Sequence, residues 1–279
     1  MLSTRPITEI SYLSAQSGGN IQDSQGLPVT ERGVCWSVTP NPTIDNNKVV
    51  NGSGTGQFIS ELTNLTFNTT YYVRAYAKNS IGTFYGQELT FKTLFPPSDA
   101  DDNYYNEVKI GNQTWLRENL KTTRFQNGDL IAADKLSNYE NNVSFNEPYG
   151  KLYHFDVTQD ARKVCPTGFH VPTRTEWNQL VENLGGANIA GGKLKSVGLE
   201  HWAPPNTGAD NSSGFTALPA GRRADDGSFA ALSFNAVFWS SSSFDGSTAF
   251  YFSLFNSNSN VFSTGVSKSY QMSIRCIKD

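Results

Sequence analysis

Apolar and polar residues alternate along the first third of the chain, most clearly in residues 71–78. Extended backbone sends successive side chains to opposite faces, so this run predicts a strand with one apolar face. Residues 33–37 and 88–93 form further runs of this kind, and turn residues such as those at 79–82 separate the runs. Short strands at regular spacing predict an all-β sandwich for residues 1–94.

A helical pattern dominates the middle of the chain. Apolar residues recur at i, i+3, i+4 and i+7, as Trp177, Leu180, Val181 and Leu184. Thr173-Arg-Thr-Glu176 is a capping box, and Gly185 supplies the left-handed conformation that ends a helix. A second short helix is expected over residues 191–196, and the sequence after Phe215 indicates short strands and loops. These patterns predict an α+β domain over residues 106–279.

Residues 95–105 separate the two patterns and predict a linker. Pro96 and Pro97 stiffen the backbone, and the acidic, polar residues that follow are poor core formers. Asp99, Asp101 and Asp102 fit either a solvated segment or an ion site. Their spacing lacks the ligand pattern and glycine of a calcium loop, which favours the solvated segment.

Composition narrows the classes of function. The formal net charge is −3 and no basic run occurs, which argues against a nucleic-acid partner. No apolar run reaches the ~18 residues that span a bilayer, and no signal peptide is visible at the first residues. Either an export signal has been removed, or the protein leaves the cell as part of a particle. Abundant Asn, Ser, Thr, Gly and aromatic residues indicate a β-rich secreted or surface protein.

Candidate catalytic chemistry is sparse. His154, His170 and His201 lack the spacing of zinc ligands, and no Gly-x-Ser-x-Gly elbow occurs. The glycines of residues 52–56 lack the strand-then-helix setting of a phosphate loop and are interpreted as a hairpin loop. No enzyme activity, cofactor or metal is therefore expected.

The three cysteines leave two readings open. Cys35 lies in mid-strand, where a small apolar residue packs well. Cys165 precedes the helix and Cys276 lies on the last strand. They form either a disulfide, which would suit an oxidising compartment, or two buried thiols.

Residues 4–94 resemble fibronectin type III domains. Leu65 followed by Tyr71 is similar to their tyrosine corner, and residues 33–37 fit their central strand. Such domains commonly precede binding modules in bacterial surface proteins, so the resemblance implies a spacer.

Residues 108–279 resemble the FISUMP-type "major paralogous" domain, a variant of the C-type-lectin-like fold found in bacterial surface proteins. The resemblance lies in six sequence words. They are Gly111-Asn-Gln-Thr-Trp-Leu-Arg-Glu-Asn-Leu120, Tyr149-Gly-Lys-Leu-Tyr153, Cys165-Pro-Thr-Gly-Phe-His-Val-Pro172, Gly214-Phe-Thr-Ala-Leu-Pro-Ala-Gly221, Phe238-Trp-Ser-Ser241 and Ser273-Ile-Arg-Cys-Ile-Lys-Asp279. It implies an α+β domain whose loops bind ligands.

The sequence departs from two relatives of that fold. Calcium-dependent lectins use a Glu-Pro-Asn or Gln-Pro-Asp loop and a Trp-Asn-Asp strand, whereas Glu147-Pro148 is here followed by Tyr149. Formylglycine-generating enzymes need an active-site cysteine pair, for which no candidate is evident. Neither activity is expected.

Residues 240–271 have an unusual composition. They contain eleven serines, three asparagines and seven aromatic residues, but only Asp245 and Lys268 are charged. Aromatic rings with small polar side chains are the composition of antibody contact loops. Randomising the adenines of an AAC codon cannot produce Lys, Glu, Gln, Met or Trp, and only Lys268 and Gln271 fall in that set. The segment thus resembles the variable proteins of diversity-generating retroelements; the alternative is an undiversified binding module.

Alternation within this segment selects candidate contact residues. Phe250, Phe252 and Leu254 share one face and are assigned to the core, with the opposite face of the strand as the alternative. Ile274 and Cys276 should point inward. Residues 256–260 should form a loop. The candidate ligand contacts are Ser241, Ser243, Phe244, Asp245, Tyr251, Phe255, Asn256, Asn258, Asn260, Phe262 and Tyr270.

These patterns predict a non-catalytic extracellular recognition protein, located on a bacterial cell surface or a phage particle. Its expected partner is a protein or glycan receptor, with no nucleic acid and no membrane span. The competing hypothesis is a structural pilus, fibre or cell-surface subunit that does not bind a ligand independently.

Overall fold

The computed structural model describes residues 1–24 and 26–279. The chain divides into two compact units, Met1–Pro96 and Pro97–Asp279. Each unit has its own hydrophobic core. Among the described residues, no helix is both long enough and apolar enough to span a membrane.

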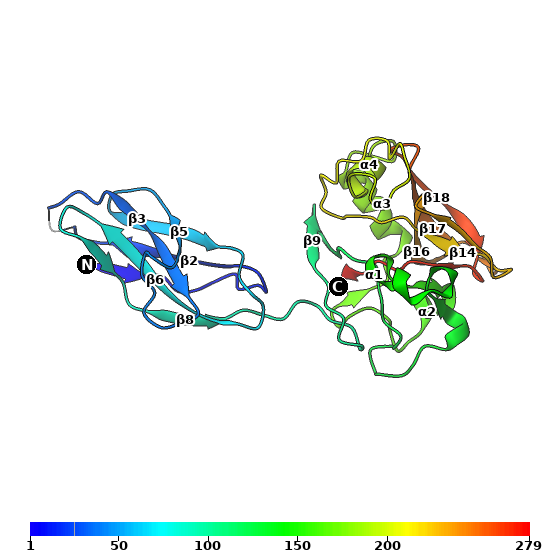
Figure 1. The fold of residues 1–279 in the computed structure, drawn as a ribbon, viewed down its shortest axis with the longest axis horizontal. Coiled ribbons are helices and arrows are strands. Elements are labelled where there is room, and N and C mark those ends of the chain that lie inside the picture. Colours follow the sequence, from blue (N-terminus) through cyan, green and yellow to red (C-terminus); the bar gives the residue numbers. More distant parts are fainter. Residues whose placement is uncertain (25) are drawn as a thin grey trace. The chain divides into compact units, whose positions relative to one another are not determined.

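The first unit is a sandwich of two antiparallel sheets (Figure 1). One sheet has the order β1–β2–β5, with bounds Leu2–Thr4, Ala15–Ile21 and Gly56–Leu62. The other has the order β4–β3–β6–β7, and β8 also pairs with β6; the bounds of β3, β4, β6, β7 and β8 are Glu31–Ser37, Asn47–Val50, Thr70–Lys78, Thr83–Tyr85 and Leu89–Lys92.

Strand β6 confirms the apolar face expected within residues 71–78, although Tyr76 on the opposite face is buried as well. Its side chains Tyr71, Val73, Ala75 and Ala77 are all buried in the core of the first unit. Tyr71 also uses its polar end, because its Oη accepts a hydrogen bond from the Thr66 amide at 2.9 Å. This is the backbone contact of a tyrosine corner.

The loop at residues 52–56 differs from its expected role as a hairpin. Strand β4 pairs with β3, whereas β5 pairs with β2. The loop therefore connects the two sheets, because its flanking strands have different partners.

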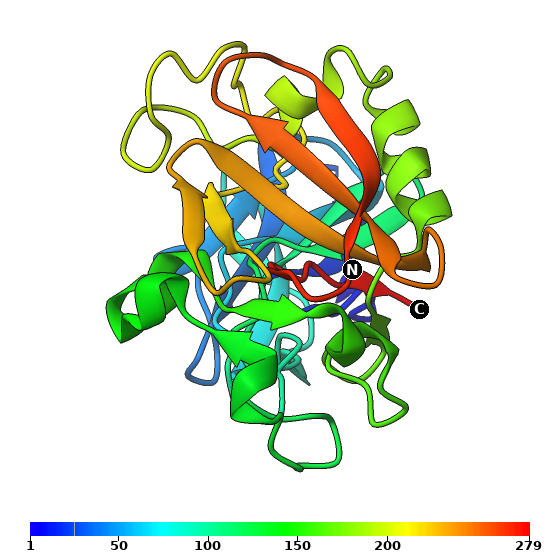
Figure 2. The same cartoon turned by 90° about the vertical axis from the view of Figure 1, so that its right-hand side faces the viewer.

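The second unit contains three small sheets and four short helices (Figure 2). A four-stranded sheet has the order β13–β20–β10–β9, with bounds Phe169–His170, Ile277–Lys278, Gln113–Leu116 and Glu107–Ile110. A five-stranded sheet has the order β11–β12–β19–β14–β15, with bounds Leu136–Ser137, Leu152–His154, Gln271–Met272, Ala220–Arg223 and Phe229–Leu232.

The third sheet, β16–β17–β18, spans Asn235–Ser243, Thr248–Phe255 and Val261–Ser267. The helices are α1 Asn146–Tyr149, α2 Phe155–Gln159, α3 Arg174–Asn183 and α4 Ala190–Leu194. Three 3₁₀ turns cover Ala133–Lys135, Tyr139–Asn141 and Val143–Phe145.

Helix α3 forms where its sequence pattern places it. The Thr173 side chain accepts a hydrogen bond from the Glu176 amide, and the Glu176 side chain accepts one from the Thr173 amide. Trp177 faces the β16–β18 sheet and stacks on Phe252, with ring centroids 5.1 Å apart. Helix α4 is shorter than the expected segment and lies beside the same sheet (Figures 1 and 2).

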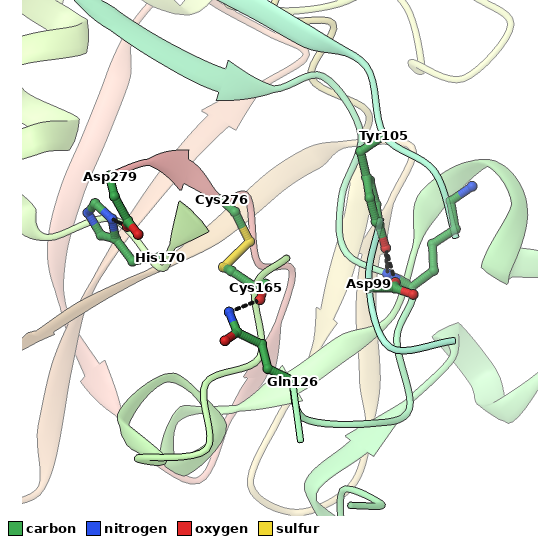
Figure 3. The surroundings of a disulfide bond; sticks show 8 residues. Asp99, Tyr105, Gln126, Cys165, His170, Cys276 and Asp279 are labelled. Carbon is green, nitrogen blue, oxygen red and sulfur yellow. Dashed lines mark hydrogen bonds and ion pairs between the residues drawn. A yellow bond between two sulfur atoms is a disulfide. The ribbon is translucent and has the colours of Figure 1, made fainter. Parts of the chain in front are cut away.

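The expected linker 95–105 is wrong for residues 97–105, which belong to the second unit. Tyr105 is 1% exposed, and its hydroxyl donates to the Asp99 carboxylate at 2.5 Å (Figure 3). The Asp101 carboxylate likewise accepts hydrogen bonds from Thr123 and pairs with Arg124. The carboxylates of Asp99 and Asp101, which suggested a solvated segment, instead hold residues 97–105 against the rest of the second unit.

Cys165 and Cys276 form a disulfide (Figure 3), which decides between the two readings of these residues. Cys276 is buried, directly before β20, and Cys165 lies in the loop before β13. Cys35 is a buried free thiol in the first unit, and burial raises its pKa to about 11.

Candidate recognition surface

The β16–β18 sheet has core side chains on both of its faces. On one face Phe252 and Leu254 pack with Phe238 in the core beneath α3, as the alternation predicts. Phe250, expected in the same core, is only partly buried, because it lies near the open end of the sheet beside Phe244. On the other face Val237 and Trp239 pack in a second core. Candidate contacts are therefore confined to the turns, to the edge strand β18 and to the rims of both faces.

None of the eleven candidate contact residues is buried. Ser243, Phe244, Asp245 and Phe262 are exposed. The other seven are partly exposed, namely Ser241, Tyr251, Phe255, Asn256, Asn258, Asn260 and Tyr270. The structure divides most of them between the β16–β17 turn and the β17–β18 turn, at opposite ends of the sheet.

Asp245 holds the β16–β17 turn in one conformation. Its carboxylate accepts hydrogen bonds from the amides of Ser247 and Thr248 at 2.8 and 2.7 Å. The bond from the Ser247 amide is the largest of the effects that lower the pKa of Asp245 to about 2. Lys268 Nζ donates to the carbonyls of Asp245 and Gly246, which ties the turn to the segment after β18. Asp245 therefore positions the turn, and its carboxylate is already engaged.

This ordered turn presents the ring of Phe244, whose side chain is 55% exposed. The Phe244 ring meets the Phe250 ring edge to face, with centroids 4.9 Å apart. The Arg174 guanidinium lies over Phe250, 4.1 Å from its centroid. Opposite Phe250 on β18 is Gly265, where a Cβ would stand 2.7 Å from the Phe244 ring. We call Arg174, Phe244, Phe250 and Gly265 the ring platform.

The β17–β18 turn is fastened by a buried lysine. Lys195 Nζ donates to the carbonyls of Thr207, Phe255 and Asn258, each at 2.9 Å. Burial lowers the pKa of Lys195 to about 8. Asn256 adds two bonds from its amide to the carbonyls of residues 203 and 204. The loop expected at residues 256–260 is present. Some of its polar groups form hydrogen bonds within the domain and are not available to a ligand.

The aromatic candidates differ in how freely they face solvent. Phe262 is 45% exposed on the edge strand and meets Phe255 edge to face at 5.1 Å. Tyr251 and Tyr270 pack against the core that contains Val237 and Trp239, so only part of each ring is exposed to solvent. The freest rings among the candidates are therefore Phe244 and Phe262.

Ser241 lies apart from both turns. It borders a pocket of about 340 Å³ together with His170. The two ring nitrogens of His170 contact Asp279 at 2.7 Å and Glu176 at 2.8 Å (Figure 3 shows the Asp279 contact). Because both nitrogens are engaged by carboxylates, the ring has no free lone pair with which to activate the serine.

Ligands for a metal do not gather in the described part of the chain. No group of three or more His, Cys, Asp or Glu side chains that could hold an ion occurs there.

Sequence reasoning missed Arg174 and Gly265 as members of the surface. Arg174 entered only as part of the capping box, and its contact with Phe250 joins segments 76 residues apart. A glycine within a strand is a signal for close approach of another group, which Gly265 bears out.

The family model described as the Fibrobacter succinogenes major domain matches residues 108–278. No curated protein matches the sequence.

Several solved structures are similar to about a third of this chain. The sixth fibronectin type III domain of human fibronectin type III domain containing protein 3 is 24% identical, with a TM-score of 0.26; the match covers 33% of this chain and 82% of that one. The sensor domain of the anti-sigma factor RsgI4 in Pseudobacteroides cellulosolvens is 20% identical, with a TM-score of 0.27, over 34% of this chain and 93% of that one. A myokine structure is 15% identical, with a TM-score of 0.26, over 33% of this chain and 96% of that one.

Proposed function

Because this chain belongs to the Fibrobacter succinogenes major domain family, we propose that it is a non-catalytic extracellular recognition protein that binds a protein or glycan receptor. Its location is a bacterial cell surface or a phage particle. Residues 106–279 act as a C-type-lectin-like binding domain, and residues 1–94 act as a fibronectin type III-like spacer. Binding requires no metal, cofactor or nucleic acid.

The ring platform is the observation that carries this proposal. Phe244 is exposed, yet the Asp245 turn and its contacts with Phe250 and β18 hold it in place. A rigid exposed ring binds a partner at low entropy cost, because little motion is lost on contact. Arg174 adds a cation over the neighbouring Phe250 ring, and no carboxylate pairs with its side chain among the described residues. Rings with guanidinium groups are the side chains that dominate binding energy at interfaces.

Variation of residues 240–271 by a diversity-generating retroelement is part of the proposal. Its support is the segment's composition and the exposure of the turns at its two ends. The neighbouring DNA tests it: an imperfect copy of this segment, differing at adenines and next to a reverse transcriptase gene, is expected. Without such a copy the binding module is undiversified.

Binding of the full chain to arrayed glycans and to intact bacterial cells tests recognition. Phe244→Ser and Arg174→Gln should each weaken binding about ten-fold, because hot-spot side chains contribute about 1–2 kcal/mol or more. Leu130→Ser is the matched control, since Leu130 is 64% exposed in the same unit and lies outside the platform. Its binding should equal that of the unchanged protein.

Two outcomes would overturn recognition through the platform. Phe244→Ser and Arg174→Gln variants that bind as well as the Leu130→Ser control place the contact elsewhere. A chain that binds no glycan and no cell, but assembles with itself, favours the structural alternative.

That alternative rests on the edge strand β18. It pairs with β17 on one side, and residues 262–264 at its start are exposed. An edge strand can pair with a second chain, as in a fibre or pilus subunit. Sedimentation over a range of concentrations separates the two: a monomer at high concentration excludes this alternative.

A further inference from the structure

Arg275 is a buried cation in the second unit. Its side chain is 1% exposed, and the guanidinium lies 4.3 Å from the Phe215 ring centroid and 5.5 Å from that of Phe238. Nε and Nη2 donate to Asn119 Oδ1, at 3.1 and 2.8 Å. Nη1 donates to the carbonyls of Leu116 and Phe215. All of its acceptors are therefore neutral oxygens.

The guanidinium has more charge and more donors than these contacts use. Four of its roughly five N–H groups are engaged, which leaves one on Nη2 without a partner among the described residues. No carboxylate forms an ion pair with it in that part of the chain. Burial lowers the pKa of Arg275 to about 9, and Glu118 and Arg117 shift it in opposite directions. A buried charge without a counter-ion is costly, so an anion beside it would be stabilised.

A pocket of about 150 Å³ lies beside this guanidinium. Arg275, Arg117 and Lys121 line it, together with Glu118 and Glu147. Both of these carboxylates are engaged: Glu118 accepts two hydrogen bonds from Asn106, and Glu147 pairs with Lys121. Three cations face two anions, so the lining carries one excess positive charge.

We propose that this pocket binds the carboxylate group of a small ligand, such as a sugar acid or an acidic amino acid. The carboxylate would accept the free Nη2 hydrogen of Arg275 and lie close to Arg117 at the mouth. Charge-assisted bonds from a guanidinium are among the strongest contacts available to a carboxylate. The pocket is lined by residues 117–119, 121, 147, 148, 216, 218 and 275, none of which belongs to the ring platform.

The probes are acetate, D-glucuronate and N-acetylaspartate, with glucose as the neutral control. At constant sodium chloride, the full chain should bind each acid with a Kd on the order of 1 mM and should not bind glucose. The side-chain signals of Asn119 and Arg275 in nuclear magnetic resonance spectra should shift during the titration. The ranking of glucuronate against N-acetylaspartate shows whether the source of the carboxylate is a sugar or a peptide.

Two variants at Leu218 differ only in charge. Leu218→Glu adds a carboxylate to the pocket lining and should weaken acid binding by about ten-fold or more, whereas Leu218→Gln should retain it. Arg117→Gln, at an exposed position, should weaken binding about five-fold, and Lys109→Gln outside the pocket should leave it unchanged. Equal binding by all four variants, unshifted Asn119 and Arg275 signals, or equal binding of glucose would each overturn the proposal.

Discussion

Gly265 determines where the Phe244 ring can lie. A Cβ at this position would stand 2.7 Å from the ring, closer than side chains pack. Because Phe244 is more than half exposed, the ring can move aside instead of breaking the core. Because glycine has no Cβ, the Phe244 ring can pack against this position and is held there although it is exposed.

We expect Gly265→Ala to displace the ring and to weaken receptor binding about ten-fold, with a loss of stability below about 1 kcal/mol. Gly246→Ala is the control, because no atom lies within 4 Å of a Cβ at that position. Binding and urea denaturation of the two variants measure both effects. A Gly265→Ala variant that keeps full affinity would show that the ring's position does not matter.

His170 makes the stability of the second unit depend on pH. Burial lowers its pKa, but the hydrogen bonds to Asp279 and Glu176 outweigh burial and raise the pKa above the usual value. The stabilisation is therefore fully present below about pH 6.5, the ordinary pKa of histidine. It is lost as the pH rises through the raised pKa of the folded state.

Urea denaturation between pH 5.5 and 8.5 should show this decline in the unchanged protein. His170→Gln should flatten it, since glutamine does not titrate. A decline of the same size in His170→Gln would assign the pH dependence to another group.

At the scale of elements, helix α3 is the part of the fold that local sequence determines most fully. Its cap, its apolar stripe and its end are all encoded within residues 173–185. Strand β6 is similar, because alternation alone identifies its buried face. Both predictions succeed because the information lies within a single short segment of the sequence.

Thr173→Ala should lower the free energy of unfolding of the second unit by about 1 kcal/mol, because the helix loses its capping oxygen. Thr175→Ala, two residues further on and exposed, should be neutral or slightly stabilising. Chemical denaturation of both variants measures the difference. Equal stabilities would mean that the cap contributes nothing.

Pairings between distant segments were beyond sequence reasoning. Strand β20 lies between β10 and β13, and residues 97–105 belong to the second unit. The local sequence of neither segment indicates which distant residues it contacts. In the candidate site, too, the local features could be predicted and the contacts between distant segments could not. Composition indicated the turns of residues 240–271, but it could not show that Asp245 and Asn256 are used internally or that Arg174 joins the surface.

At the scale of the whole molecule, the disulfide links residues separated by 111 positions within the second unit. Closing a loop of this length restricts the unfolded chain, which stabilises the folded unit by about 2–5 kcal/mol. The first unit has its own core and contains only the buried Cys35. The bond should therefore affect one unit alone.

Calorimetry with and without a reductant should show one transition that shifts to lower temperature and one that does not. The variant with Cys165→Ala and Cys276→Ala should already have the lower transition and should not respond to the reductant. If both transitions shift together, the two units unfold cooperatively.

Strand β20 occupies an interior position in its sheet, between β10 from the start of the second unit and β13. Residues 271–277, which lead into it, are buried without exception. This sheet is complete only when β20 is in place, because β10 and β13 each pair with β20 and not with each other. Removing residues 271–279 would leave β10 with an open edge and Cys165 without its disulfide partner, so the second unit should fail to fold.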